Sequence, residues 1–267
     1  MRRASAFIED KRSRGVWLGG ALVALVVLTA LVGPVVVTAD PNRQDLLHVL
    51  AAPSREALLG TDHLGRSVLA RLVHAARLSL SLGAMAVATA ALPGIGLGLA
   101  TAFAGGWTDR LLTSLADAIL AVPGLILVLL IAALSPGAFW PLFLGLSLTQ
   151  WVEWFRMTRA ASRSALASPA VEAARLLGFS PWHILRRHVF PDLLPLFGTL
   201  GAFGLGSAVL ALGALGFIGF GLRPPTPEWG LMMVEMLPYW NEAPLALLMP
   251  PVCLLTLILG LQILARR

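Results

Sequence analysis

The chain has 267 residues, of which 57% are hydrophobic and 13% are charged, and its mean hydropathy is +0.81. A soluble domain of this size carries roughly 25% charged residues because water must solvate its surface. The composition therefore excludes an ordinary cytosolic enzyme, a disordered chain and a basic nucleic-acid-binding module. The formal net charge is +6, from 20 basic and 14 acidic residues, and in so apolar a chain the excess is expected to report membrane orientation.

The first predicted membrane span covers residues 16–38. It follows a basic head, residues 1–15, whose charged side chains include Arg2, Arg3, Lys11, Arg12 and Arg14. The apolar stretch is longer than the roughly 7–15 residues of a signal-peptide core, and a spanning helix needs about 20 apolar residues. We therefore expect a retained anchor whose N-terminus lies in the cytoplasm.

A polar segment on the outer side, residues 39–78, is expected next. Its second half places Leu69, Leu72, Val73 and Ala76 at helical spacing, with basic residues between them. This pattern predicts an amphipathic helix that lies on the membrane or on a partner and leads into the second span. For each arginine of this helix, the pattern is equally consistent with a solvated charged face and with a specific contact. The basic residues of this side are Arg43, Arg55, Arg66, Arg71, Arg77 and Arg223.

The rest of the chain, residues 79–264, is expected to form a five-helix core. Apolar runs predict spans at about residues 79–103, 111–134, 139–155, 193–222 and 243–264. With the first span this makes six, so both termini fall on the same side, and residues 265–267 form a cytoplasmic C-terminus. On this topology fourteen basic residues, Arg266 and Arg267 among them, are cytoplasmic and six are outside, which is the asymmetry that membrane proteins show.

The predicted cytoplasmic loop, residues 156–192, is too long for a simple connection, since most are shorter than about 12–15 residues. Ser168-Pro169 and Ser180-Pro181 each supply an N-cap and a proline at the first helical position. Gly178 between them is free to adopt a positive φ. Two short helices beside several arginines are therefore expected, which suits docking to another protein. A DNA-binding helix-turn-helix would be held against the membrane, so no nucleic-acid partner is expected.

Four sequence blocks, whose order along the chain is that of the family, resemble the permease subunits of ABC importers. Glu172-Ala173-Ala174, followed by Gly178, Phe190-Pro191 and Leu194-Pro195, is similar to the EAA loop of these permeases. The other blocks are residues 59–71, residues 105–110 together with Asp117 and Pro123, and residues 215–230. The match is closer still to the C-type permease subunit of dipeptide, oligopeptide and nickel importers. It covers the chain from about residue 59 to 250.

The resemblance implies an all-α integral membrane protein with six transmembrane helices and the type I ABC importer permease fold. It implies a homologous second permease related by a pseudo-twofold axis, two ATP-binding subunits, an extracytoplasmic substrate-binding protein, and the prokaryotic plasma (inner) membrane as the location. By the same resemblance, the segment around Glu172 to Gly178 forms a coupling helix inserted into a groove of an ATPase subunit. The residues expected to carry this coupling are Glu172, Ala173, Ala174, Arg175, Gly178, Phe179, Arg186 and Arg187.

Two features depart from the family pattern. The family commonly has a glutamate in the fifth span, and Leu212 occupies the corresponding position here. The family's polar tail after the sixth span is also missing, since the chain stops at Arg267. Because of the first departure, the polar residues that line the pathway in relatives cannot be assigned to positions in this chain. The second is expected to affect cytoplasmic contacts only.

The chain lacks the residues that catalysis would need. A phosphate-cradling loop ends in Gly-Lys-Ser/Thr, yet the only lysine is Lys11, with no glycine before it. The five histidines show no HExxH pattern and no cysteine partners, so no metal site is expected. No nucleophile–base pair is evident either. We expect a non-catalytic subunit without a cofactor of its own, with ATP and magnesium bound by its partners.

Ionisable residues within spans are few, and each is a functional candidate. Asp117 would lie about 12 Å into the third span, where it lines the translocation path, pairs with an arginine of the partner, or is hydrogen-bonded near the interface. Pro123, Gly216 and Gly219 are further candidates for the pathway or for close helix packing.

The expected function is that of a permease subunit which forms half of a pathway for di- and oligopeptides. A nickel or metal-chelate importer is the alternative, disfavoured because no His or Cys cluster indicates direct metal handling. A self-contained secondary transporter is less favoured, since it would carry ionisable residues near the middle of the membrane and no docking loop.

Overall fold

The computed structural model describes the backbone of residues 2–265 and the side chains of residues 15–265. The predicted basic residues of both termini lie outside the described side chains: Arg2, Arg3, Lys11, Arg12, Arg14, Arg266 and Arg267. The described chain is helical, with no strand beyond an isolated bridge between Thr61 and Ser67. Its elements are α1 (Arg2–Val36), α2 (Val68–Ala104), α3 (Gly106–Leu120), α4 (Gly124–Ala133), α5 (Phe139–Leu166), α6 (Pro169–Leu176), α7 (Pro181–Ile184), the π-helix η1 (Leu185–Val189), α8 (Phe190–Phe217), α9 (Trp229–Met236), the 3-10 helix η2 (Leu237–Tyr239) and α10 (Pro244–Ala265).

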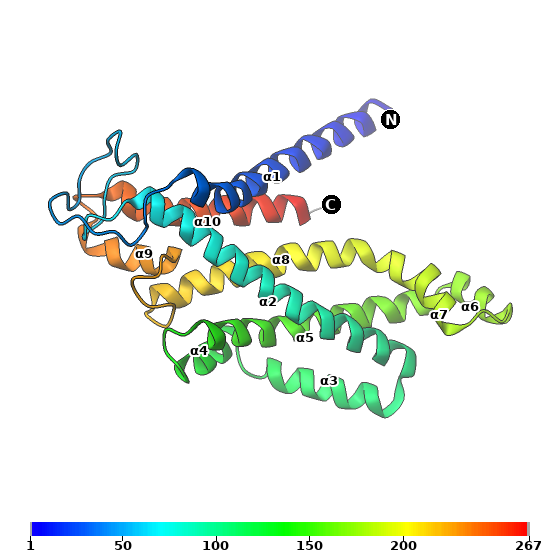
Figure 1. Cartoon of the computed structure of the whole chain (residues 1–267). Coiled ribbons are helices and arrows are strands. Elements are labelled where there is room, and N and C mark those ends of the chain that lie inside the picture. The colour runs from blue at the N-terminus through cyan, green and yellow to red at the C-terminus, as the bar shows by residue number, and fades with distance from the viewer. Residues whose placement is uncertain (1, 266–267) are drawn as a thin grey trace.

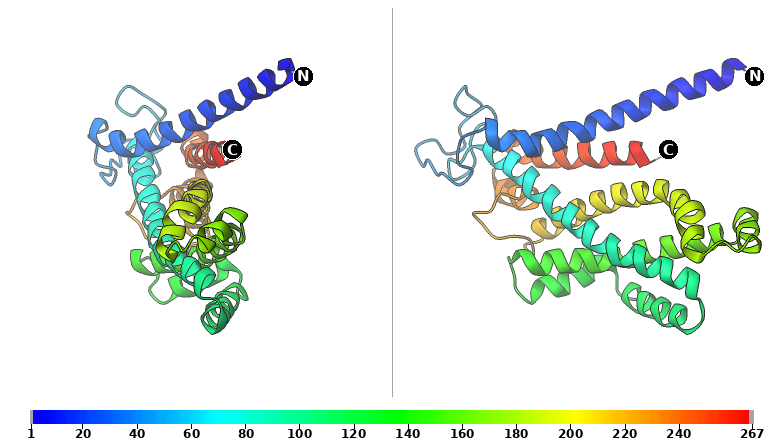
Figure 2. Two further views of the ribbon diagram at one scale, coloured as in Figure 1. Left: turned by 90° about the vertical axis from the view of Figure 1, so that its right-hand side faces the viewer. Right: turned by 45° about the vertical axis from the view of Figure 1, so that its right-hand side comes forward.

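The long helices run roughly along one axis, so the molecule has two distinct ends (Figure 1). Helices α6 and α7 lie at one of them, which we call the hairpin end, and the first turns of α1 and the last turns of α10 point toward it. The segment 37–67 and α9 lie at the other, which we call the loop end. Helices α1 and α10 run side by side, and the further views in Figure 2 show the same arrangement.

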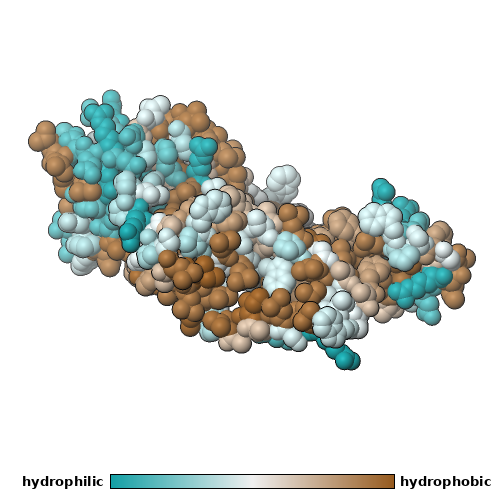
Figure 3. Space-filling model, turned by 60° about the horizontal axis from the view of Figure 1, so that its bottom comes forward, coloured by the Kyte–Doolittle hydropathy of each residue, from teal (hydrophilic) through white to brown (hydrophobic). Residues whose placement is uncertain are grey.

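Hydrophobic residues cover the middle of the face shown in Figure 3, whereas hydrophilic residues gather toward its two ends. Four helices of the described chain are long and apolar enough to cross a membrane: Gly15–Val36 within α1, α2, the continuous run Pro181–Phe217 and α10. Helices α3 and α4 provide a fifth crossing if they count as one bent span. This is the pattern of a multi-pass membrane protein, in which apolar side chains face lipid.

Helix α5, over which a span was predicted, is not among these candidates. It has 28 residues and continues well beyond the predicted span end at residue 155, so the first part of the predicted loop 156–192 is helical. The helix carries Glu153 and Arg156 near the predicted span end and two more arginines in its last turns. These charges lower the mean hydropathy of the helix, so its composition does not make it a candidate span.

Two further predictions of helix organisation differ from the structure. The amphipathic helix predicted in residues 39–78 is not a separate surface element, because α2 begins at Val68 and continues unbroken to Ala104. Ser67 caps its first turn by accepting a hydrogen bond from the backbone N–H of Ala70. The predicted span 111–134 is two helices, α3 and α4, bent by 78°, because Pro123 at the break cannot continue a helix.

Helices α2 and α5 form the most extensive helix contact of the described chain. A Cβ atom added at Gly94 would lie 2.5 Å from Cβ of Trp154, and one at Gly98 would lie 2.8 Å from Cβ of Thr158. The two glycines are four residues apart, the small-residue spacing that lets membrane helices approach closely. This packing fixes α5, which leads directly to α6 and α7 at the hairpin end.

Candidate functional site

The α6–α7 hairpin (residues 168–189) is built by local capping. Ser168 and Ser180 accept hydrogen bonds from the backbone N–H groups of Val171 at 3.4 Å and His183 at 3.3 Å, so each helix begins where the Ser-Pro pairs predicted. Gly178 has φ +79°, and the N–H of Phe179 donates to the carbonyl of Ala174 at 3.1 Å. This is the C-terminal motif that a left-handed glycine permits.

The inner side of the hairpin is apolar and attaches it to the helical core. Val171, Ala174 and Ile184 are buried with Val189 and Leu193, and residues of α2, α5 and α8 pack against them. Ala174 is only 4% exposed. The expectation that Ala174 shares a docking surface with Ala173 is therefore wrong, because its side chain faces the core.

The outer side of the hairpin exposes a tip of large apolar side chains. Leu176 is 85% exposed, Leu177 75%, Trp182 68% and Phe179 46%. The remaining predicted coupling residues are also exposed on this hairpin: Glu172, Ala173, Arg175, Gly178, Arg186 and Arg187. Leu176 and Leu177 were not among the predicted coupling residues. Their position at the end of α6, directly before Gly178, was the sequence signal that could have indicated them.

A charge cluster at the hairpin end ties α3 to α5. Asp109 of α3 accepts hydrogen bonds from Nε of Arg159 at 2.5 Å, from Nη2 of Arg159 at 2.8 Å and from Nη2 of Arg163 at 2.7 Å. Bidentate arginine–carboxylate pairs of this kind are geometrically specific. Two arginines of the predicted loop are thus structural and hold α5 in place just before the hairpin.

The candidate pathway residues fall into two groups. Asp117 is more than half exposed, and its Oδ1 lies 3.7 Å from Nη1 of Arg156 in the same chain. Pro123 stands at the bend between α3 and α4. Gly216 is buried where α8 contacts α9, and Gly219, with φ +83°, follows the end of α8. The N–H of Gly219 donates to the carbonyl of Gly216 at 3.1 Å, so these two glycines are neighbours.

Leu212, at the position where the resembled family commonly has a glutamate, is fully buried. It belongs to an apolar cluster with Leu82 of α2, Val128 of α4 and Leu146 of α5. A carboxylate placed among these side chains would lose its hydration without gaining a partner. The leucine therefore agrees with its surroundings.

The loop end is held by four charged side chains, of which three are buried and Glu235 is 12% exposed. Arg66 donates from Nε to Oδ2 of Asp62 at 2.6 Å and from Nη2 to Oε2 of Glu235 at 3.0 Å. Arg71 donates from Nη2 to the same Glu235 oxygen at 2.7 Å. Both arginine side chains are 1% exposed, so the solvated charged face considered from the sequence is wrong for these two residues. We call Asp62, Arg66, Arg71 and Glu235 the loop-end network.

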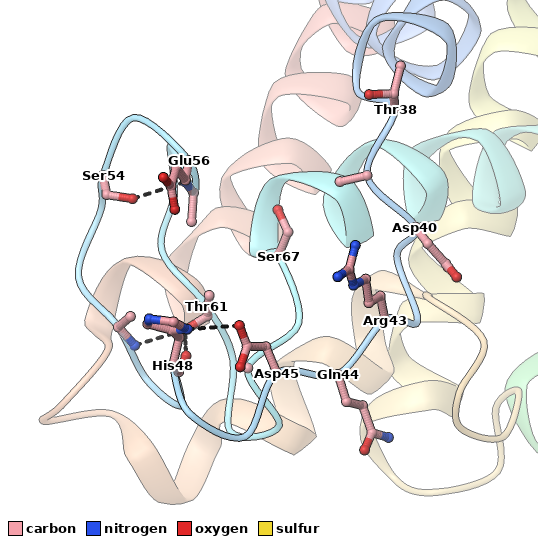
Figure 4. Close-up of a pocket in the computed structure, with 14 residues that line it drawn as sticks. Thr38, Asp40, Arg43, Gln44, Asp45, His48, Ser54, Glu56, Thr61 and Ser67 are labelled. Atoms are coloured by element: carbon pink, nitrogen blue, oxygen red, sulfur yellow. Dashed lines mark hydrogen bonds and ion pairs between the residues drawn. The ribbon is translucent and has the colours of Figure 1, made fainter.

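Residues of the segment 37–67 line an open pocket of about 690 Å³ at the loop end (Figure 4). Side chains of both charges line it, among them Asp40, Arg43 and Glu56. Nδ1 of His48 lies 2.8 Å from Oδ2 of Asp45, and this contact lowers the pKa of Asp45 below its usual value. Across the described residues, no group of three or more His, Cys, Asp or Glu side chains is placed to hold a metal ion.

Glu228, outside the candidate spans, caps α9 from a buried position. Its carboxylate accepts hydrogen bonds from the N–H groups of Gly230 and Leu231, both at 2.8 Å. A Cβ atom at Gly216 would meet this carboxylate, so the glycine makes room for it. Burial raises the pKa of Glu228 to about 7, although both backbone N–H groups act to lower it.

We expect stability to fall as the pH rises through the interval between the two pKa values of Glu228. Between about 4.5 and about 7, the unfolded chain has lost this proton whereas the folded chain still holds it, so each pH unit costs up to about 1.4 kcal/mol. Thermal unfolding of the purified protein at the two ends of the interval measures the effect. Glu228→Gln keeps one of the two acceptor oxygens, carries no charge, and should remove this part of the pH dependence. An unchanged pH dependence would contradict the assignment.

Comparison with known proteins identifies a family that this chain matches. Residues 94–267 match the family model described as "Binding-protein-dependent transport system inner membrane component". The chain is 35% identical to a di/tripeptide transport system permease protein of Pseudomonas aeruginosa, over 92% of this chain and 84% of that protein. It is 32% identical to a probable D,D-dipeptide transport system permease protein of Escherichia coli, over 80% and 72%. Among solved structures, the methionine ABC transporter MetNI in an inward-facing conformation matches 73% of this chain and 93% of that one, with a TM-score of 0.58 and 19% identity, which shows a shared fold.

Proposed function

Because the chain belongs to the family of inner-membrane components of binding-protein-dependent transport systems, we propose that it is the C-type permease subunit of an ATP-driven importer of di- and oligopeptides. The subunit forms half of the translocation pathway and performs no chemistry itself. ATP and magnesium are bound by two separate ATPase subunits, a homologous permease supplies the other half of the pathway, and an extracytoplasmic binding protein delivers the peptide. The peptide permeases among its relatives support this substrate.

The proposed topology has six crossings: α1, α2, the bent pair α3–α4, α5, α8 and α10. Helix α5 has 28 residues, which at 1.5 Å per residue reach about 42 Å, more than the roughly 30 Å hydrocarbon core. Its arginines stand toward the hairpin end, near where lipid headgroups would lie. The hairpin end, with residues 1–15 and 265–267, is then cytoplasmic, in keeping with the excess of basic residues predicted there.

The α6–α7 hairpin is proposed to be the coupling element that contacts an ATPase subunit. The observation that carries this assignment is the exposed apolar tip at Leu176 and Leu177, on a hairpin whose inner side is anchored to α2, α5 and α8. A surface of this kind outside the membrane is an interaction site rather than a lipid contact. Glu172, Arg175 and the other exposed polar residues beside the tip orient the contact. A displacement of the hairpin would pass directly to α8, because η1 and α8 follow α7 without a break.

The test is uptake by proteoliposomes that contain the complete transporter, its binding protein and ATP. Gly178→Val should lower uptake of radiolabelled alanyl-alanine roughly tenfold, because a β-branched residue at φ +79° costs about 1–2 kcal/mol. A Cβ atom there meets nothing within 4 Å, so a steric clash does not contribute. Gly178→Asn, which tolerates this conformation, is the matched control and should retain most of the uptake. Glu172→Lys should uncouple transport while the chain stays in the membrane.

Three results would contradict the proposal. Normal uptake by both Gly178→Val and Glu172→Lys would remove the hairpin from the coupling mechanism. Uptake of radioactive nickel without uptake of the dipeptide would assign the transporter to metal import. Dipeptide transport by the chain alone, driven by an ion gradient without ATPase subunits, would make it a secondary transporter.

A further inference from the structure

An apolar groove lies between the last turns of α2 and the start of α7. It has a volume of about 320 Å³ and is lined by Leu99, Ala100, Phe103, Pro181, Trp182 and Leu185. Every one of these side chains is apolar. Helix α2 is a candidate membrane span that ends at Ala104, so the groove adjoins the end of a candidate span.

Except for Trp182, which belongs to both surfaces, the groove is distinct from the exposed tip of the hairpin. The tip residues Leu176 and Leu177 belong to the end of α6 and do not line the groove. One wall of the groove is instead part of the candidate span α2. Its ring of apolar side chains includes Trp182, which is 68% exposed, and tryptophan is the residue type that prefers the interface between hydrocarbon and headgroups.

Two arginines follow the groove directly in the sequence. Arg186 and Arg187 come after the lining residue Leu185, and Arg186 stands four residues, about one helical turn, beyond Trp182. Both are exposed, and no carboxylate of the described residues lies within ion-pair distance of either guanidinium. This distinguishes them from Arg159 and Arg163, which Asp109 neutralises.

We propose that the groove binds one acyl chain of an anionic phospholipid of the adjacent leaflet, with the headgroup phosphate at Arg186 and Arg187. The apolar walls match a hydrocarbon chain, and guanidinium groups recognise phosphate oxygens with two parallel hydrogen bonds. Basic residues at the edge of a span bind anionic headgroups in this way. The proposal requires that the chain is embedded in a membrane. It assigns Arg186 and Arg187 to a lipid headgroup in place of the ATPase contact expected for them from the sequence, and it does not depend on peptide transport.

The test is lipid binding to the complete transporter purified in detergent, measured by native mass spectrometry. Phosphatidylglycerol should bind roughly tenfold more tightly than phosphatidylcholine of the same acyl chains. The double variant Arg186→Gln/Arg187→Gln should remove this preference. Arg110→Gln is the matched control, because Arg110 is an exposed arginine near the start of α3 that does not adjoin the groove, and it should leave the preference unchanged.

A second measurement places the acyl chain. Phosphatidylglycerol with brominated acyl chains should quench part of the tryptophan fluorescence, and Trp182→Phe should remove that part. Equal binding of the two lipids, an equal effect of Arg110→Gln, or quenching that does not involve Trp182 would each overturn the proposal. None of these readouts uses uptake or ATP hydrolysis, so a failure here is distinguishable from a failure of the proposed function.

Discussion

Replacing Glu235 with alanine should lower the free energy of unfolding by about 3–5 kcal/mol, the cost of breaking a buried ion pair by removing one partner. Glu235 accepts hydrogen bonds from both Arg66 and Arg71, and the side chains of these arginines are 1% exposed. The variant therefore leaves two buried guanidinium groups with the single carboxylate of Asp62. Denaturant or thermal unfolding of the purified protein in detergent measures the loss.

The control for this prediction is Glu242→Ala. Glu242 is an exposed glutamate in the connection between η2 and α10, so its removal should change stability by less than about 0.5 kcal/mol. A second variant separates charge from packing: Glu235→Leu combined with Arg71→Met replaces one buried pair by apolar groups and should recover most of the stability. A loss below about 1 kcal/mol for Glu235→Ala, or no recovery in the double variant, would contradict a role for the network in stability.

The network also explains how the loop end keeps its shape. The Oδ1 atom of Asp62 accepts hydrogen bonds from the N–H groups of Leu64 and Arg66, both at 2.9 Å, so the turn before α2 is held by the same carboxylate that binds Arg66. Glu235 belongs to α9, and α9 packs on α8 at Gly216. The four charges thus join the segment 37–67, the start of α2 and α9 into one unit.

The double variant Leu176→Ser/Leu177→Ser should abolish co-purification of the chain with its ATPase subunits. Apolar side chains at the centre of an interface contribute about 2 kcal/mol each when they are hot spots, so losing two weakens the complex by roughly 1,000-fold. The unfolding temperature of the isolated chain should stay the same, because the side chains are 85% and 75% exposed and their polar replacements remain in solvent. Tagged purification followed by quantification of the ATPase gives the result.

The matched control is Leu46→Ser with Leu47→Ser. These adjacent leucines are 69% and 90% exposed, and they lie in the segment 37–67, outside the hairpin. Their replacement should leave the ATPase bound. If both double variants release the ATPase, the effect is a general consequence of lost apolar surface, and if neither does, the tip is not the docking site.

Much of the hairpin was predictable because its signals are local. Ser168-Pro169, Ser180-Pro181 and Gly178 act on backbone groups within four residues, so the helix starts and the turn follow from neighbouring side chains. The multi-pass membrane character was likewise predictable, since hydropathy sums over a continuous segment. The α3–α4 bend was missed although Pro123 marked it, because the apolar run on both sides hides a change of direction.

The sequence alone determined that this is a multi-pass membrane protein and that it carries a capped helical hairpin. Only the tertiary structure decided which side chains of that hairpin face outward: Ala174 is buried and Leu176 is exposed, although both belong to one short helix. Only the structure brought Arg66 and Arg71 to Glu235, across 169 and 164 residues of sequence. The reason is that capping and hydropathy are properties of neighbouring residues. Burial and charge pairing depend on which surfaces, distant in the sequence, pack together and so exclude lipid and water.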